Sequence, residues 1–100
     1  MNILWTKHAT NCLVKIENYI ALDDPVAAQR WTDQLIQRTK VLAEHPHAGR
    51  KLPEMPQANL RELIEGNYRI VYRIHGETVE ILTVFERHRL LPQDDIQGRE

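Results

Sequence analysis

Residues 66–92 read GNYRIVYRIHGETVEILTVFERHRLLP, and the alternation within this stretch decides the fold. Apolar and charged residues alternate from Tyr68, stop at Gly76 and resume at Thr78, with the period of two that a half-buried β-strand has. A turn with Gly76 first and Glu77 second suits the type II′ geometry of a two-residue connection. The stretch therefore predicts an antiparallel β-hairpin.

The predicted turn also fixes which residues of the hairpin face each other. One face is almost wholly apolar and contains the pairs Ile74–Val79, Tyr72–Ile81, Ile70–Thr83 and Tyr68–Phe85. The other face contains Arg73–Glu80, Val71–Leu82 and Arg69–Val84, followed by Glu86 and His88. A slip by one residue would place Tyr72 opposite Glu80 and break the opposite-charge pair, so we expect this register. Glu80 explains Arg73, whereas Arg69 has no partner in this register and is the better site candidate.

The first residues of the chain predict a short strand and a helix. Residues 2–6 are an apolar, β-prone run, and residues 8–22 then follow a helical period. Thr6 or Thr10 is the candidate N-cap of this helix. Its apolar side carries Cys12, Leu13, Ile16, Tyr19 and Ile20.

A second helix should begin after Asp24, a good N-cap, with Pro25 at the first helical position. It should end near His45, because a proline follows. The few residues between the two helices require an antiparallel helical hairpin. Residues 45–59 contain three prolines and a glycine and should form a loop, and residues 60–66 should form a short strand.

The predicted fold class is α+β, a single domain over residues 1–100 with the order β-α-α-β-β-β. The apolar face of the hairpin should cover the helical hairpin, which then packs on one face of a small, mainly antiparallel sheet. No helix remains for the second face. We therefore expect Val71, Leu82 and Val84 to leave apolar surface bare there.

Composition narrows the classes of protein to which the chain can belong. The formal net charge is −1, whereas free-standing nucleic-acid-binding proteins rely on a basic excess. The single cysteine, Cys12, excludes an intramolecular disulfide, suits a reducing cytosol and should lie in the core. No apolar run approaches membrane-spanning length and the N-terminus lacks a signal-peptide pattern, so we expect a cytoplasmic protein without membrane association.

The remaining candidate sites have structural explanations. His45 and His47 are close in sequence, but a stable zinc site needs at least three protein ligands, and no cysteine or carboxylate cluster accompanies them. Serine is absent from the chain, which excludes a serine nucleophile. We therefore expect no metal and no cofactor.

Four segments, taken in order, resemble the RelE/ParE superfamily of toxins from bacterial type II toxin–antitoxin modules. They are YIALDDPVAAQRW (19–31), LAEHPHAGRKLPE (42–54), LRELIEGNYRIVYRI (60–74) and VEILTVFERHRLLP (79–92). The resemblance covers nearly the whole chain, and YRIVYRI before a strand that ends in His/Arg is its most specific part. It implies a cytoplasmic toxin, neutralised by a co-produced antitoxin in a hetero-oligomer that meets DNA through the antitoxin.

The superfamily has two kinds of target. RelE-like members cut mRNA on the ribosome, whereas ParE-like members poison DNA gyrase and have lost the nuclease residues. For the nuclease, the resemblance matches Arg69 to the strand arginine and Arg89, or Arg87, to the arginine that ends the last strand. Lys51 matches a basic loop residue, and His88 is the side chain suited to general acid or base catalysis near neutral pH.

Three features favour the ParE-like target and a toxin that binds rather than catalyses. No tyrosine follows Tyr72, the chain is nearly neutral, and Asp94 and Asp95 lie where a phosphate-binding tail would be basic. The residues expected to contact gyrase are Arg69, Arg87, His88 and Arg89. Those expected to contact the antitoxin are Val71, Leu82 and Val84. Two alternatives remain: a ribosome-dependent mRNA endonuclease that uses Arg69, His88 and Arg89, and an inactive toxin fold that only binds its antitoxin.

Overall fold

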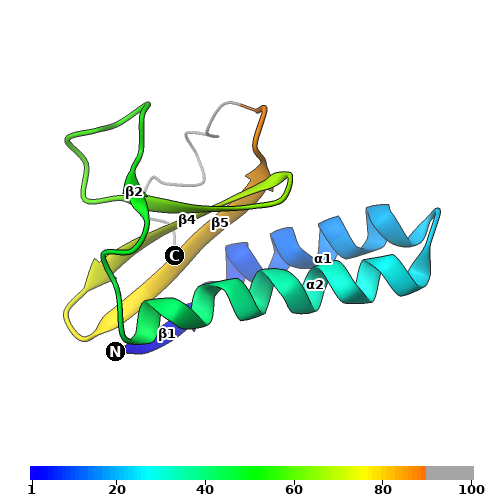
Figure 1. Cartoon of the computed structure of the whole chain (residues 1–100), viewed down its shortest axis with the longest axis horizontal. Coiled ribbons are helices and arrows are strands. Elements are labelled where there is room, and N and C mark those ends of the chain that lie inside the picture. Colours follow the sequence, from blue (N-terminus) through cyan, green and yellow to red (C-terminus); the bar gives the residue numbers. More distant parts are fainter. Residues whose placement is uncertain (90–100) are drawn as a thin grey trace.

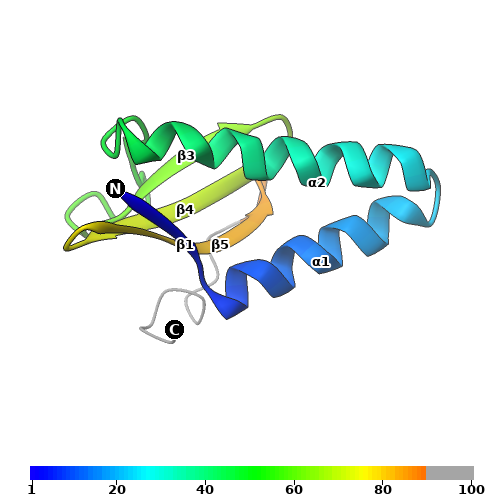
Figure 2. The same cartoon turned by 90° about the horizontal axis from the view of Figure 1, so that it is seen from below.

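The computed structural model describes residues 1–89. Its elements are β1 (Asn2–Trp5), α1 (Lys7–Ala21), α2 (Pro25–Thr39), the 3-10 turn η1 (Lys40–Ala43), β2 (Arg50–Lys51), β3 (Arg61–Glu65), β4 (Tyr68–His75) and β5 (Thr78–Glu86). The α+β class and the predicted order are confirmed, with the two-residue strand β2 added before β3. The two helices lie on one side of the sheet, and the tip of their hairpin extends beyond the strand ends (Figure 1, Figure 2).

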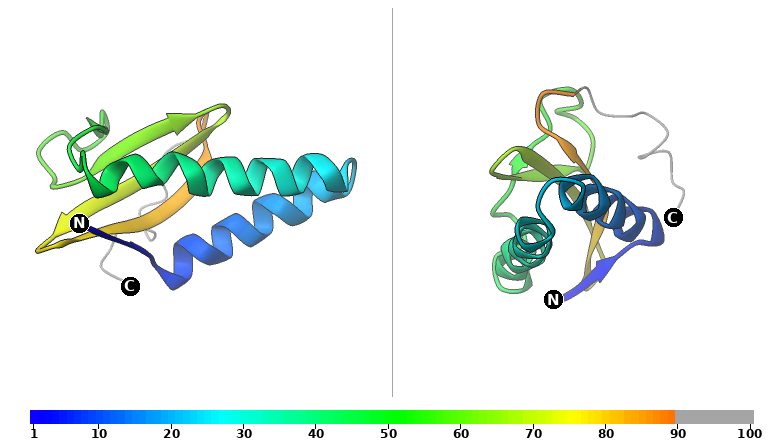
Figure 3. Two further views of the ribbon diagram at one scale, coloured as in Figure 1. Left: turned by 60° about the horizontal axis from the view of Figure 1, so that its bottom comes forward. Right: turned by 90° about the vertical axis from the view of Figure 1, so that its right-hand side faces the viewer.

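Within residues 1–89 the strands form one mixed sheet in the order β1-β5-β4-β3-β2. β1 runs parallel to β5 at one edge, and the other neighbours are antiparallel. Figure 3 shows that the loop before β3 lies on the opposite side of the sheet from both helices. Neither helix in this part of the chain has the length and apolar content needed to cross a membrane.

Both helices begin at side-chain caps that the sequence predicts. The Thr6 hydroxyl, rather than that of Thr10, accepts a hydrogen bond from the Ala9 amide at 3.1 Å and donates to the Ile81 carbonyl at 2.8 Å. This cap therefore also ties α1 to β5. One carboxylate oxygen of Asp24 accepts the first amides of α2. The α-helix ends at Thr39, and η1 replaces its expected last turn.

The β4–β5 hairpin follows the predicted register only between its turn and Tyr72. Tyr72 pairs with Ile81 as expected, but Val71 pairs with Thr83, so β5 carries Leu82 as an additional residue in a β-bulge. The predicted pairs beyond this point were therefore wrong. The observed pairs are Val71–Thr83, Ile70–Val84, Arg69–Phe85 and Tyr68–Glu86. The bulge puts Val84 into the cluster beneath the helices and Phe85 into the cluster on the opposite face.

The two faces of the sheet carry separate apolar clusters. The helix-side core contains Ala9, Leu13, Leu35, Leu42, Leu63, Ile70, Tyr72, Val79, Ile81 and Val84. The second cluster contains Leu52, Leu60, Val71, Leu82 and Phe85, with Met55 and Ala58 packed against it. The loop before β3 thus covers the second face. The expectation that this face is bare was wrong, because the proline-containing loop carries apolar side chains, Leu52 and Met55 among them, that pack on it.

The start of this loop is held by the hydroxyl of Tyr72. That hydroxyl donates to the Pro46 carbonyl at 2.7 Å and accepts from the Gly49 amide at 2.9 Å. A Cβ atom at Gly49 would lie 2.6 Å from the Glu62 carbonyl oxygen and 2.7 Å from the Tyr72 hydroxyl. The loop therefore approaches the sheet at a distance that only glycine allows.

Candidate functional site

Arg69 lies on the face of the sheet opposite the helices, as predicted, but it is buried. Its side chain is 8% exposed, and its Nε donates to Glu62 at 2.6 Å. Nη1 and Nη2 each donate to one carboxylate oxygen of Glu54 at 2.7 Å. The guanidinium carbon also lies 5.0 Å from the centre of the Phe85 ring. All three guanidinium nitrogens are thus engaged within the chain.

The surrounding charges form a four-residue cluster, Arg50, Glu54, Glu62 and Arg69, which we term the arginine centre. The Glu62 side chain is fully buried, and its second oxygen accepts from Arg50 Nε at 2.6 Å. The hydrogen bond to Glu54 is the largest cause that raises the pKa of Arg69 above its ordinary value. Arg69 faces Phe85 and so has no charged partner on the facing strand, as the register predicts, but β3 and the loop supply Glu62 and Glu54 as partners that the register could not indicate.

The Arg87-His88-Arg89 segment follows the end of β5, and its side chains are exposed. The Arg87 amide donates to the Asn67 carbonyl at 2.8 Å, and the Arg89 amide donates to the Glu86 carbonyl at 3.0 Å. Because the strand ends at Glu86, the segment turns and no longer alternates. Contact of Arg69 and of this segment with gyrase stays a prediction.

Two different hollows receive the arginines of this segment. Arg87 borders a small polar hollow of about 180 Å³ together with Arg50, Glu54 and Arg69. Arg89 instead borders a larger hollow between α1 and the end of β5. Lys51 is exposed on β2, and Asp94 and Asp95 lie outside the described residues.

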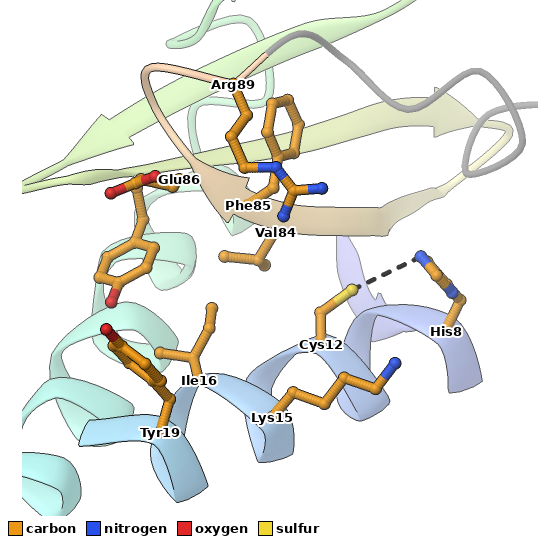
Figure 4. A pocket seen from close by; sticks show the side chains of 10 residues that line it. His8, Cys12, Lys15, Ile16, Tyr19, Val84, Phe85, Glu86 and Arg89 are labelled. Atoms are coloured by element: carbon orange, nitrogen blue, oxygen red, sulfur yellow. Dashed lines mark hydrogen bonds between the residues drawn. The ribbon is translucent and has the colours of Figure 1, made fainter.

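The larger hollow, about 480 Å³, is termed the α1 groove. It is lined by His8, Cys12, Lys15, Ile16 and Tyr19 of α1 and by Tyr68, Val84, Phe85, Glu86 and Arg89. Figure 4 shows the Arg89 side chain reaching from the end of β5 toward α1, with Ile16, Cys12 and Val84 between them. The pattern of the sequence did not predict this groove, since it assigned the same stripe of α1 to the core.

Cys12 packs partly against the helix-side core, as expected, but it also faces the groove. Its Sγ lies 3.5 Å from His8 Nε2 and 3.6 Å from the Thr83 hydroxyl (Figure 4). At the other end of the groove, burial and the nearby Glu86 carboxylate raise the pKa of Tyr68. The groove therefore has an apolar floor and polar ends.

The three residues predicted to contact the antitoxin are covered by the chain itself. Val71, Leu82 and Val84 are 0%, 8% and 3% exposed. Among residues 1–89 no group of three or more histidine, cysteine, aspartate or glutamate side chains is placed to hold a metal ion. His45 and His47 are exposed in the loop after η1.

Comparisons with known proteins identify the family. Residues 3–91 match the model of the ParE toxin of type II toxin–antitoxin systems, parDE. The chain is 35% identical over 89 residues to the toxin RelE2 of Caulobacter vibrioides, covering 88% of this chain and 97% of that relative. The fold resembles the chromosomal ParDE system of P. aeruginosa, with a TM-score of 0.74 and 24% identity, over 86% of this chain and 95% of that chain. The RelBE2 toxin–antitoxin complex of Mycobacterium tuberculosis gives a TM-score of 0.55 and 26% identity, over 88% and 92%. Since the family model spans most of the sequence, this chain belongs to the ParE toxin family of type II toxin–antitoxin systems.

Proposed function

We propose that this toxin acts by binding DNA gyrase and not by cutting mRNA. The observation that carries the proposal is that Arg69 is held in ion pairs within the chain. The hypothesis of a ribonuclease requires this strand arginine to act on RNA. Its three nitrogens already bind Glu54 and Glu62 at 2.6–2.7 Å. A guanidinium whose N–H groups already bind two carboxylates has little capacity left to stabilise the negative charge that develops on the phosphate during RNA cleavage.

An RNA phosphate at this position would have to displace Glu54 from Arg69. Glu62 would then remain buried beside the phosphate, and two anions in one low-dielectric site repel each other strongly. Arg89 and His88, the other residues of the nuclease reading, do not border the hollow that Arg69 shares with Arg87. This separation supports a binding surface over an assembled catalytic site.

Ribosome-dependent mRNA cleavage is the second candidate. The similarity to proteins named RelE2 and RelBE2 favours it, and so does the hollow that brings Arg50 and Arg87 beside Arg69. In this reading Arg69, His88 and Arg89 would be catalytic. Paired assays on the same toxin preparation separate the two targets.

The first assay measures supercoiling of relaxed plasmid by purified gyrase, and the second measures cleavage of mRNA in a reconstituted translation system. We expect dose-dependent inhibition of supercoiling with accumulation of cleaved DNA complexes, and intact mRNA. Codon-specific mRNA cleavage with unimpaired supercoiling would refute the proposal. Unimpaired supercoiling and intact mRNA, together with normal growth when the toxin is expressed alone, would identify an inactive toxin fold.

A charge-removal pair tests the residues proposed to contact gyrase. The exposed Arg87 and Arg89 are replaced together by glutamine, and the exposed Arg30 of α2 is replaced by glutamine as the matched control. We expect the double variant to weaken inhibition of supercoiling about tenfold or more, as the loss of two interfacial charges commonly does. Arg30→Gln should inhibit as the parent chain does.

The antitoxin is the second proposed partner. Both similar solved structures are named as toxin–antitoxin systems or complexes. We therefore propose a cytoplasmic toxin–antitoxin hetero-oligomer in which the antitoxin alone contacts operator DNA. This arrangement agrees with the formal net charge of −1, which supplies no basic excess for DNA binding by the toxin.

A further inference from the structure

We infer that two copies of the free toxin associate through β1, which lies at an open edge of the sheet. In this dimer the two β1 strands run antiparallel, so that the two sheets join into one. The dimer is independent of the proposed target and of the antitoxin, because it involves neither the arginine centre nor the α1 groove. The backbone of β1, its exposed Leu4 and the charges at its two ends all suit this arrangement.

The two edges of the sheet are protected to different degrees. Among residues 1–89, β2 forms one edge and β1 forms the other, and Figure 2 shows β1 along the margin of the sheet. β2 has two residues, Arg50 and Lys51, and both are charged. β1 has four residues, Asn2–Trp5, with no charge, proline or glycine among them. Charges and prolines commonly keep an edge strand from pairing with another chain, so β1 is the edge that accepts a further strand.

The backbone of β1 directs two residues away from the sheet. The amides of Asn2 and Thr6 each donate at 3.1 Å to a main-chain carbonyl of the hairpin that β4 and β5 form. Because successive residues of a strand point their amides to opposite sides, those of Ile3 and Trp5 face outward. A second strand at this edge would therefore pair with Ile3 and Trp5.

The exposed Leu4 marks the two-fold axis of the dimer. Pairing Ile3 of each copy with Trp5 of the other uses both outward-facing residues and sets the two Leu4 residues opposite each other. Ile3 and Trp5 pack against the helix-side core, so Leu4 points to the other face, where it is 51% exposed and borders a hollow of about 310 Å³. Contact between the two Leu4 side chains would remove this apolar surface from water.

The charges at the two ends of β1 are complementary. Glu77 flanks the start of the strand, Lys7 follows its end, and both side chains are exposed. Antiparallel pairing about Leu4 brings Lys7 of one copy within two strand spacings of Glu77 of the other, roughly 10 Å between Cα atoms, which the two side chains together span. The two-fold axis makes this contact twice. The Met1 ammonium, a cation at the same end, is directed to the Ala43 carbonyl at 2.8 Å.

The tip of the helical hairpin is a poorer dimer contact, although it exposes more apolar surface. Leu22 and Val26 are 82% and 71% exposed there, but Asp23 and Asp24 lie between them in the sequence. Two such tips would bring like charges together, whereas antiparallel β1 strands bring opposite charges together.

Sedimentation equilibrium of the purified free toxin, from about 1 µM to about 1 mM, tests the dimer, because so small an interface predicts weak and reversible association. Leu4→Asp sets two carboxylates on the two-fold axis, and Leu22→Asp makes the same change at the distant tip. We expect Leu4→Asp to weaken association at least about tenfold and Leu22→Asp to leave it unchanged. A parent chain that stays monomeric throughout this range, or a dimer that Leu4→Asp leaves intact, would overturn the inference.

An exchange of charges tests the antiparallel direction. Lys7→Glu and Glu77→Lys each place like charges opposite each other at both ends of the dimer, so each variant alone should associate about tenfold more weakly. Mixed in equal amounts, the two variants should form a heterodimer as tight as the parent dimer, because both contacts then join opposite charges. A mixture that associates no better than either variant alone would refute this arrangement.

Amide hydrogen exchange shows which side of β1 makes the contact. The Ile3 and Trp5 amides gain hydrogen bonds in the dimer, whereas the Thr6 amide already donates to the Ile81 carbonyl. Measured by NMR at low and high toxin concentration, exchange at Ile3 and Trp5 should slow at least about threefold, with Thr6 unchanged. Equal slowing at all three residues, or protection of Ile3 and Trp5 only after the cognate antitoxin is added, would overturn the inference.

Discussion

The arginine centre and the α1 groove are both lined by cationic side chains, but they use them in opposite ways. In the arginine centre the charges of Arg69 and Glu62 are satisfied by ion pairs within the chain. In the groove Lys15 and Arg89 border an accessible apolar floor. Arg69, in the motif YRIVYRI, therefore holds the loop to the sheet, whereas Arg89 and Lys15, which lies in none of the four family-like segments, border an open surface. The contrast predicts large stability effects in the first region and small ones in the second.

The sharpest test of the contrast is Arg69→Gln. It removes one partner of Glu54 and one partner of the fully buried Glu62, and breaking a buried ion pair from one side costs about 3–5 kcal/mol. We expect a loss of that size in the free energy of unfolding, measured by urea denaturation. The exposed Arg50 gives the control, since Arg50→Gln should cost about 1 kcal/mol or less. Equal, small losses in both variants would mean that Arg69 does not hold the loop.

Removal of the Tyr72 hydroxyl should have the next largest effect. Tyr72→Phe keeps the ring in the core but leaves the Gly49 amide and the Pro46 carbonyl without this partner. We expect a loss of about 1–3 kcal/mol in the free energy of unfolding. Hydrogen exchange should also accelerate in residues 46–60 while α1 is unaffected. Uniform acceleration through both regions would contradict a local role for the hydroxyl.

The Arg73–Glu80 pair lies between the two extremes, because it is only partly buried. The hydrogen bond from Arg73 lowers the pKa of Glu80 below its ordinary value of 4.5. Glu80 therefore stabilises the fold above about pH 4.5, and this contribution is lost as the pH falls through the lowered pKa. We expect Glu80→Gln to cost about 0.5 kcal/mol at pH 7 and less at pH 3. If the loss of unfolding free energy in Glu80→Gln were larger at pH 3 than at pH 7, the ionised Glu80 carboxylate would not be the stabilising form.

The smallest effect on stability should come from the groove. Lys15→Gln removes an exposed charge, so the free energy of unfolding should change by no more than about 0.5 kcal/mol. Urea denaturation of Lys15→Gln beside the parent chain measures this change. A stability loss comparable to that of Arg69→Gln would remove the distinction between the two regions.

The elements of this fold were predictable because their signals are local. The alternation around Gly76, the cap at Asp24 and the helical period after Thr6 each depend on neighbouring residues. The partners of Arg69 were not predictable in this way, since Glu54 lies 15 residues away in a loop and Glu62 lies on a neighbouring strand. Charge alternation within one hairpin carries no information about either.

The sequence did not predict the α1 groove or the loop that covers the second face, and the reason is related. Ile16 and Tyr19 share a helical stripe with Leu13, but the packing of α1 buries Leu13 and leaves Tyr19 exposed. Only the position of α1 relative to β5 determines where along the stripe burial ends. The apolar residues Leu52 and Met55 are the sequence signal for the loop cover, since a loop that stays in solvent has no need of them.

The additional residue at Leu82 affects how relatives of this toxin should be aligned. A relative that lacks the bulge would need a one-residue gap at Leu82, because position-by-position matching would otherwise equate Phe85, which contacts Arg69, with a side chain facing the helices. Family-wide statistics compiled without that gap would average two chemically different environments over the last four residues of β5. Placing the gap by the pairing Val71–Thr83 would recover which positions truly correspond.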